Sequence, residues 1–145
     1  MKFEKFYKII TEEHRIDFVY HGGDIENLTA LLNDFKILTP DEKRKLASTG
    51  GGNVGLSTSL DKNKAKRYSS VFGNNYVLKI KVDSNTNIYK IDTDGEGLDM
   101  FIYDDDGNIK QELLKYDALL EIDKEAEEEL RILNPNKFTP IKIIE

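Results

Sequence analysis

Short hydrophobic segments, separated by turn residues, constrain the fold of this chain more than any other feature. The segments are rich in β-branched and aromatic residues and alternate with polar ones, which predicts strands rather than helices. The expected strands are 16–20, 54–60, 75–82, 87–91, 119–122, 130–133 and 141–144. Because a polar turn at Ser84-Asn85 joins 75–82 to 87–91, we expect these two segments to pair as antiparallel strands.

Helices are expected before and between the first strands. Asp24 is suited to cap a helix that includes Leu32, and Asp61 is suited to cap one that Gly73 ends. The spacing of aromatic residues and isoleucines predicts a further helix at 3–13.

The remaining segments are expected to be loops and turns. Residues 35–52 contain a proline and three consecutive glycines, which indicates a loop. Aspartate- and glycine-rich segments at 92–96 and 104–108 indicate hairpin turns rather than calcium loops, and the second is flanked by 100–103 and 109–114. No repeat or linker divides the chain, so we expect one α+β domain over 1–145, with 1–15 as an N-terminal helix before a core at 16–145.

Composition excludes several classes of chemistry. A chain of 145 residues without cysteine has no disulfide framework, no Cys-ligated zinc or iron–sulfur cluster and no thiol nucleophile. Its 27 acidic and 21 basic residues give a net charge of −6, which argues against binding of duplex nucleic acid as the main activity and leaves room for a local basic patch.

Hydrophobic stretches stay far below the roughly 20 residues that cross a bilayer. The N-terminal residues also lack the charged-then-apolar order of a secretory signal. We therefore expect a cytoplasmic protein without a membrane partner. We also expect the protein to be a monomer.

Three segments carry polar or small residues where the hydrophobic pattern of a strand would be expected. They are Tyr20-His21-Gly22-Gly23, Gly55-Leu56-Ser57-Thr58-Ser59-Leu60 with Tyr68 downstream, and Glu127-Glu128-Glu129. Each alone has a structural explanation, namely a turn histidine, capping hydroxyls and a solvated acidic face. In an extended strand, however, Glu127 and Glu129 share one side and repel each other unless a cation is near.

In this order the three segments resemble the motifs of the ADP-ribosyltransferase superfamily, over roughly residues 16–144. Tyr20-His21-Gly22 resembles the histidine motif of the branch of diphtheria toxin and the poly(ADP-ribose) polymerases. Ser57-Thr58-Ser59 and Glu127-Glu128-Glu129 resemble the Ser-Thr-Ser and Glu-x-Glu motifs of the arginine-directed branch. The run after Glu129 is similar to that of small bacterial and phage-borne members. The resemblance implies split antiparallel sheets that form a β-sandwich core with flanking helices.

The resemblance also implies an activity, that of a mono-ADP-ribosyltransferase acting as a toxin or effector in a bacterial cell. Such an enzyme cleaves the nicotinamide–ribose bond of NAD without a metal and transfers ADP-ribose to an acceptor, a protein or a nucleic acid, of which the protein is favoured. Glu129 would hydrogen-bond the ribose 2′-hydroxyl and stabilise the developing cation, Glu127 would orient the acceptor, and Ser57 would brace Glu129 or NAD.

By the same resemblance, NAD would be bound by His21 at the adenosine ribose, by the Gly22 backbone at the carboxamide, by Ser57 and Thr58, and by Tyr68 stacked on the nicotinamide ring. The pyrophosphate of NAD would be bound by basic side chains that are equally well explained as a solvated helix face: Lys62, Lys64, Lys66 and Arg67. Two alternatives stay open, an NAD glycohydrolase and a non-catalytic module of the same fold that binds NAD or a partner.

Overall fold

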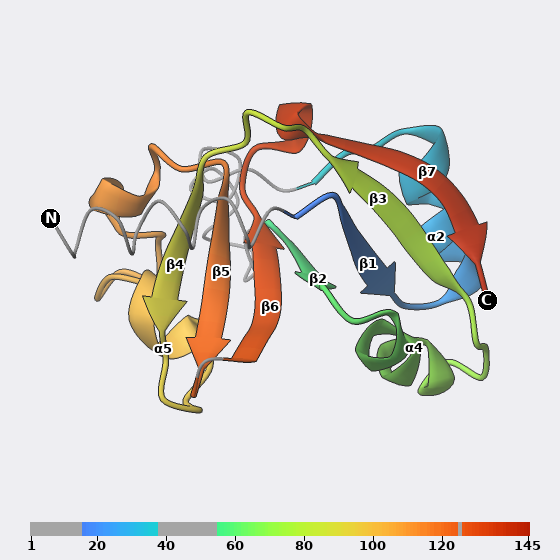
Figure 1. Cartoon of the computed structure of the whole chain (residues 1–145), viewed down its shortest axis with the longest axis horizontal. Coiled ribbons are helices and arrows are strands. Elements are labelled where there is room, and N and C mark those ends of the chain that lie inside the picture. The colour runs from blue at the N-terminus through green and yellow to red at the C-terminus, as the bar shows by residue number, and fades with distance from the viewer. Residues whose placement is uncertain (1–15, 38–54, 125) are drawn as a thin grey trace, which may run out of the picture.

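The structure, a computed structural model, describes residues 16–37, 55–124 and 126–145, without the side chains of Ala126 and Glu127. The helix expected at 3–13 and most of the loop expected at 35–52 lie outside the described residues. Within the described part, seven strands and three α-helices form a mixed α+β fold (Figure 1).

The strands are β1 (Phe18–Gly22), β2 (Leu56–Ser59), β3 (Val77–Val82), β4 (Ile88–Asp92), β5 (Ala118–Asp123), β6 (Ala126–Ile132) and β7 (Phe138–Ile144). The helices are α2 (Ile25–Asn33), α4 (Lys62–Ser70) and α5 (Asp99–Ile102), with short 3₁₀ turns η2 (Gln111–Leu113) and η3 (Pro135–Lys137).

Both predicted helix caps are confirmed. The Asp24 carboxylate accepts a hydrogen bond from the amide of Asn27 at 2.7 Å, and the Asp61 carboxylate accepts one from the amide of Asn63 at 2.8 Å. After α4, Gly73 adopts a left-handed conformation with φ of +81°, which a residue with a side chain rarely takes up.

The strands form a single sheet in the order β4-β5-β6-β2-β1-β3-β7. The resemblance predicted two separate antiparallel sheets, and this prediction is wrong. Strand β2 pairs with β6, from Leu56↔Ile132 to Ser59↔Glu129, and so joins the two halves into one sheet. The ladder between β1 and β2 is short, since Tyr20↔Ser59 is its one register pair. The sheet is therefore continuous, but β1 and β2 separate beyond this pair and leave an opening between them (Figure 1).

The predicted pairing of β3 with β4 is wrong. β3 pairs with β1 and β7, and β4 pairs in parallel with β5 at the other end of the sheet. The connection between them is held at both ends by other segments, since Asp83 N–H donates to the carbonyl of Lys137 and Asn87 N–H donates to the carboxylate of Asp117. The chain thus crosses the sheet instead of turning back in a hairpin.

The hairpin expected at 92–96 is also wrong, whereas the turn expected at 104–108 is present. The turn after β4 leads into α5, and the aspartate turn is closed by an isolated bridge, Tyr103↔Ile109, between helical segments. The reason is visible in the burial of Leu98 and Ile102, which are four residues apart and pack on Ile109 as one helical stripe.

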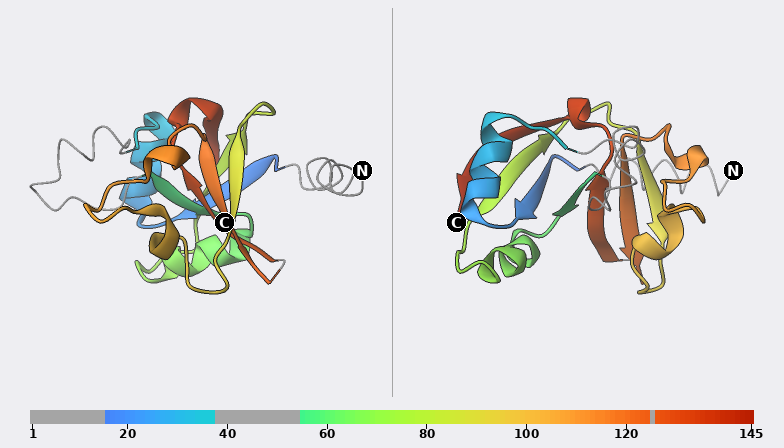
Figure 2. Two further views of the ribbon diagram at one scale, coloured as in Figure 1. Left: turned by 90° about the vertical axis from the view of Figure 1, so that its left-hand side faces the viewer. Right: turned by 180° about the vertical axis from the view of Figure 1, so that it is seen from behind.

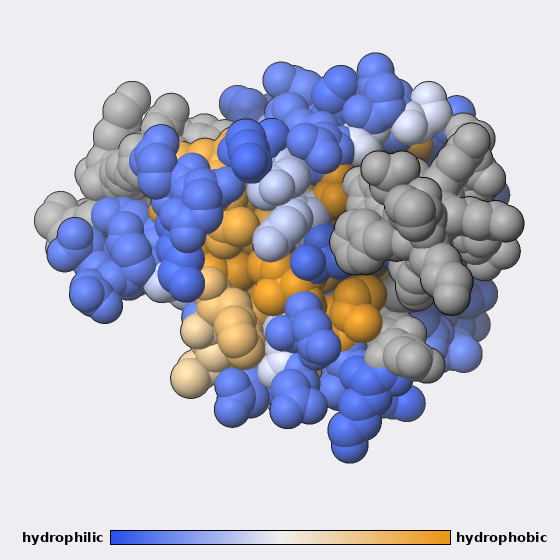
Figure 3. Space-filling model, turned by 60° about the vertical axis from the view of Figure 1, so that its left-hand side comes forward, coloured by the Kyte–Doolittle hydropathy of each residue, from blue (hydrophilic) through white to orange (hydrophobic). Residues whose placement is uncertain are grey.

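Hydrophobic side chains on the two faces of the sheet form two cores. On one face, β1, β3, β5 and β6 contribute a cluster that α2 covers with Leu28 and Leu31, and Figure 2 shows α2 on that side. On the other face, α5 and η2 cover β5 and the end of β6 around Leu119. Figure 3 shows the side of the molecule on which β4 forms the edge, where hydrophobic residues gather in the centre and hydrophilic residues surround them.

Candidate active site

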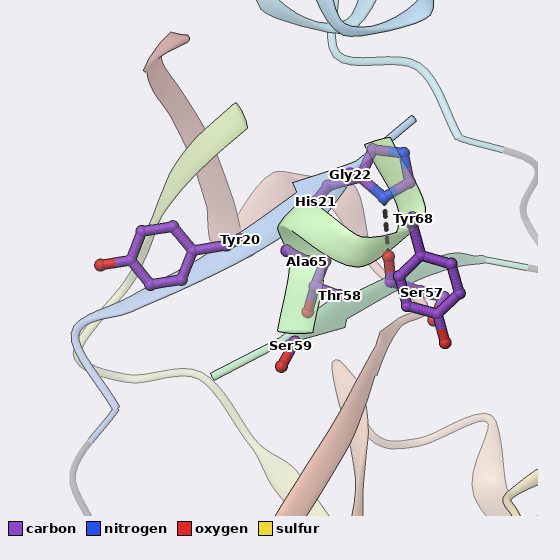
Figure 4. A pocket seen from close by; sticks show the side chains of 8 residues that line it. All are labelled: Tyr20, His21, Gly22, Ser57, Thr58, Ser59, Ala65 and Tyr68. Atoms are coloured by element: carbon purple, nitrogen blue, oxygen red, sulfur yellow. Dashed lines mark hydrogen bonds between the residues drawn. The ribbon is translucent and has the colours of Figure 1, made fainter. Parts of the chain in front are cut away.

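The opening between β1 and β2 contains a small cavity that α4 covers (Figure 4). It encloses about 70 Å³, or about 310 Å³ when the open space at its mouth is included. Its lining comes from β1, β2 and α4: Tyr20, His21, Gly22, Ser57, Thr58, Ser59, Ala65 and Tyr68. Five of the residues that the sequence singled out, His21, Gly22, Ser57, Thr58 and Tyr68, thus line one cavity.

Gly22 is required by the way α4 packs on β1. A Cβ atom built on Gly22 would lie 1.9 Å from the carbonyl oxygen of Ala65, so no larger residue fits unless the helix moves. Next to it, Gly23 N–H donates to Ser69 Oγ at 3.0 Å, and Ser69 in turn donates to the carbonyl of Tyr76. Gly22 therefore allows α4 to close over the cavity.

His21 bridges the opening with its imidazole ring. Its Nδ1 lies 2.7 Å from the carbonyl oxygen of Ser57, and since a carbonyl only accepts, Nδ1 carries the proton. Burial lowers the pKa of His21 below the ordinary value, and the hydrogen bond to Ser57 opposes this only in part. The ring is therefore neutral at pH 7, and Nε2 is left as an acceptor.

The three hydroxyls of β2 have different partners. Thr58 is buried and donates to the carbonyl of Leu130 on β6 at 2.8 Å, so its hydroxyl ties two strands together. Ser59 accepts from the amide of Asp61 at 3.0 Å, at the start of α4. Ser57 is exposed, and its hydroxyl has no hydrogen-bond partner among the residues that the structure describes. Ser57 is thus the hydroxyl of the three that remains available to a ligand.

Tyr68 stands at the mouth of the cavity. It belongs to α4, and 64% of its surface is exposed although it is aromatic. In Figure 4 its ring lies beside Ser57, whereas the side chain of Tyr20 points away from the cavity. An exposed ring at this place can stack on a flat ligand.

Glu129 lies on β6, one strand away from the cavity. Its register partner is Ser59, and the partner of Ser57 is Arg131, so these four residues share one face of the sheet. Glu129 is half-buried, and its Oε2 accepts a hydrogen bond from Arg131 Nε at 2.7 Å. The brace on Glu129 in this structure is therefore Arg131 and not Ser57.

Arg131 is the residue that the sequence reasoning missed. Its side chain is 5% exposed and binds Glu129 on its own strand, Asp99 on α5 at 3.1 Å and the hydroxyl of Tyr103 at 3.5 Å. Burial alone would lower the pKa of Arg131, but the hydrogen bonds and charges of Glu129 and Asp99 raise it above its ordinary value. Arg131 therefore remains charged and holds one oxygen, Oε2, of the Glu129 carboxylate.

The other two glutamates of the cluster differ in what the structure describes. Glu128 forms an ion pair with Lys64, which links β6 to α4. Glu127 is paired through its backbone with Ile122, and its side chain lies outside the described residues. On α4, Lys62 donates to the carbonyl of Glu145, so two of the four basic side chains proposed for a pyrophosphate already have partners.

Two further findings concern other kinds of site. Among residues 16–37, 55–124 and 126–145, no group of three or more histidines and carboxylates lies close enough together to hold a metal ion. None of the helices in that part of the chain has the length and hydrophobicity of a membrane span.

No model of a known protein family matches this chain, and no curated protein matches it either. Its function therefore has to be inferred from the site itself.

Proposed function

We propose that the chain is a mono-ADP-ribosyltransferase that uses NAD as substrate and that its sheet is a variant of the ADP-ribosyltransferase fold. The observation that carries the proposal is the meeting of three distant segments. His21, Ser57 and Tyr68 surround one cavity, and Glu129 stands on the next strand, on the same face as Ser57. A purely structural sheet has no need of a free hydroxyl, an exposed ring and a braced carboxylate at one opening.

The cavity suits one end of the substrate. Its enclosed space of about 70 Å³ is far below the roughly 300 Å³ at which pockets for whole drug-sized ligands begin. We assign the cavity together with its open mouth, about 310 Å³, to the nicotinamide ring, with Tyr68 at the mouth stacked against it and the Gly22 backbone near its carboxamide. The adenosine part then lies along the mouth, where His21 Nε2 accepts from a ribose hydroxyl.

The chemical step breaks the bond between the ribose C1′ and the nicotinamide nitrogen. The bonding electron pair leaves with nicotinamide, which becomes neutral, and the ribose becomes an oxocarbenium ion. Glu129 stabilises this cation because one of its oxygens is held by Arg131 and the other is left to face the ribose 2′-hydroxyl. A nucleophilic group of the acceptor then bonds to C1′ and releases its proton.

Arg131 acts in this account as a positioning residue. Its bonds to Asp99 and Tyr103 fix the guanidinium, and the guanidinium fixes the rotamer of Glu129. An oriented carboxylate stabilises a transition state without having to reorganise during the reaction. Glu127 is kept as the residue that orients the acceptor, as the Glu-x-Glu spacing implies.

The proposal is tested by incubating the purified protein with NAD, alone and with bacterial lysate, and measuring the nicotinamide released. Release that rises with lysate, together with label transferred to an acceptor, is the expected result. Release that lysate does not change identifies an NAD glycohydrolase instead. If no nicotinamide appears and NAD does not raise the melting temperature, the proposal is wrong and a binding module without catalysis remains.

Two variants separate substrate binding from acceptor choice. Tyr68→Ala should raise KM for NAD about tenfold through loss of stacking, while the control Tyr89→Ala, which removes a tyrosine stacked on Tyr116 far from the cavity, should not. Glu127→Ala should leave release of nicotinamide intact and reduce transfer. If both activities fall together, Glu127 does not act on the acceptor.

A further inference from the structure

One face of the β1–β3–β7 half of the sheet combines aromatic rings with lysines. In the register, Phe18 lies opposite Lys81, Tyr20 opposite Lys79, and Lys79 opposite Lys142. Residues that lie directly opposite each other in a ladder point to the same side of the sheet. These five residues therefore form one surface, which we call the lysine–aromatic face.

No helix of the described part of the chain covers the centre of this face. The alternate residues of the same strands, Val19, Leu78 and Ile80, point to the opposite side and are fully buried under α2. On the lysine–aromatic face, Phe18 is 38% exposed, and Lys81 and Lys142 are exposed. The helix α4 packs on β1 at Gly22, at the opposite end of the strand from Phe18.

The lysines and the rings already interact. Lys79 Nζ stands 4.2 Å from the centroid of the Phe18 ring, which is a cation–π contact. The face of this ring is thus reached by a charged group that solvent or a ligand can draw away. A flat ligand that displaced Lys79 would stack on the Phe18 ring, and the released ammonium group of Lys79 would be free to pair with a negative charge of the ligand.

Charge is concentrated on this half of the molecule. Residues 62–82 carry six lysines and arginines and no acidic residue, so in a chain of net charge −6 the remaining residues carry −12. The strands β1 and β7 contain no acidic residue either. A local positive field of this kind on an acidic protein attracts polyanions to one face only.

We propose that the lysine–aromatic face binds single-stranded nucleic acid. Lysines meet its phosphates, and unpaired bases stack on Phe18 and Tyr20, which is the general way in which open sheet surfaces and aromatic platforms hold single strands. A duplex hides its bases from such a platform, and an acidic peptide offers charge without flat faces to stack. Binding requires no NAD, so this inference is tested separately from the proposed function.

The experiment measures fluorescence anisotropy of a fluorescein-labelled single-stranded oligothymidylate and of its RNA counterpart at 50 mM and 200 mM salt. With three phosphate contacts, the slope of log K against log salt is about −2, so affinity should fall about 20-fold over this range. A duplex of the same length should bind at least tenfold more weakly, and polyglutamate should be a poor competitor.

Charge reversal tests the place of binding. Lys79→Glu combined with Lys81→Glu and Lys142→Glu should weaken binding more than tenfold. The matched control reverses the same number of charges elsewhere, with Lys36→Glu, Lys90→Glu and Lys115→Glu, and should stay within about twofold of the wild type. If the triple variant fails to fold, the single change Lys142→Gln on the edge strand should still make the salt slope shallower by about 0.7.

Ring removal tests the chemistry of binding. Phe18→Leu keeps a hydrophobic side chain and removes the flat ring, so it should weaken binding about tenfold at unchanged melting temperature. Absence of binding by the wild type at 50 mM salt would overturn the proposal. Equal competition by polyglutamate with no effect of Phe18→Leu would also overturn it, and would point to an acidic protein as the partner.

Discussion

The two halves of the sheet differ in charge and in how their polar groups are used. The elements β4, α5, β5 and β6 contain seven acidic and two basic residues, whereas β1, β2, β3, β7 and α4 contain no acidic and seven basic residues. In the acidic half, the charged Arg131 is buried between carboxylates, and in the other half the lysines face outward. The cavity lies within the basic half, and its β2 wall pairs with β6 of the acidic half. In the two proposals made above, the acidic half supplies the carboxylate for chemistry and the basic half supplies the surface for a polyanion.

The cavity depends on the close packing of α4 on β1, so Gly22→Ala should have the largest effect. Because the new Cβ would meet the carbonyl of Ala65 at 1.9 Å, we expect a loss of about 3 kcal/mol in the free energy of unfolding, and a cavity that no longer forms. Gly23→Ala is the control, since its Cβ would make ordinary contacts at 3.7 Å and 3.8 Å. Chemical denaturation measures both, and equal stability of the two variants would contradict this account of Gly22.

In the acidic half, Arg131→Met should have the next largest effect on stability. Loss of the guanidinium leaves Glu129 and Asp99 without their cation, and because both carboxylates are partly exposed we expect about 2 kcal/mol of destabilisation rather than the larger value of a fully buried pair. Transferase activity should fall while KM for NAD changes little, since Arg131 orients Glu129 rather than binding substrate.

The same substitution in the basic half sharpens the comparison. Arg67→Met removes an exposed arginine of α4 and should change the stability by less than about 0.5 kcal/mol. Thermal melts of the two variants side by side test the contrast. An equal loss in both would mean that the buried arginine has no special role.

The smallest expected effect concerns pH. Because burial lowers the pKa of His21, the unfolded chain takes up a proton at this residue before the folded protein does. Its contribution to stability is therefore complete above the ordinary pKa of about 6.5 and is lost as the pH falls toward the lowered value. His21→Gln should reduce the drop in melting temperature between pH 7.5 and pH 5.5. An undiminished drop would assign the pH dependence to other groups.

The sequence predicted local structure better than pairing. The alternation of Leu78 and Ile80 with lysines identified β3, and Asp24 and Asp61 identified two helix starts, because these signals lie within a few residues. The partners of β3 and β4 depend on segments such as 117 and 137, far along the chain, which the turn between them does not encode.

The site could be predicted in part for the same reason. The motif residues of β1, β2 and α4 do gather at one cavity, and a spacing of two on an extended strand was the signal that could have placed Arg131 beside Glu129. The ion pair between Asp99 and Arg131 depends on α5, a helix that the sequence pattern did not predict. The cavity is closed by the contact of Gly22 with Ala65. Both require tertiary packing.

The most direct test of the account is the rate of nicotinamide release by Glu129→Gln beside the wild type, with the exposed Glu112→Gln as control. The amide oxygen of the introduced glutamine can still accept from Arg131, so the variant should fold with a melting temperature only a few degrees lower. We predict a rate reduced by about 10² to 10³, with Glu112→Gln unchanged. A folded Glu129→Gln variant that releases nicotinamide at the wild-type rate would contradict the assignment of this site.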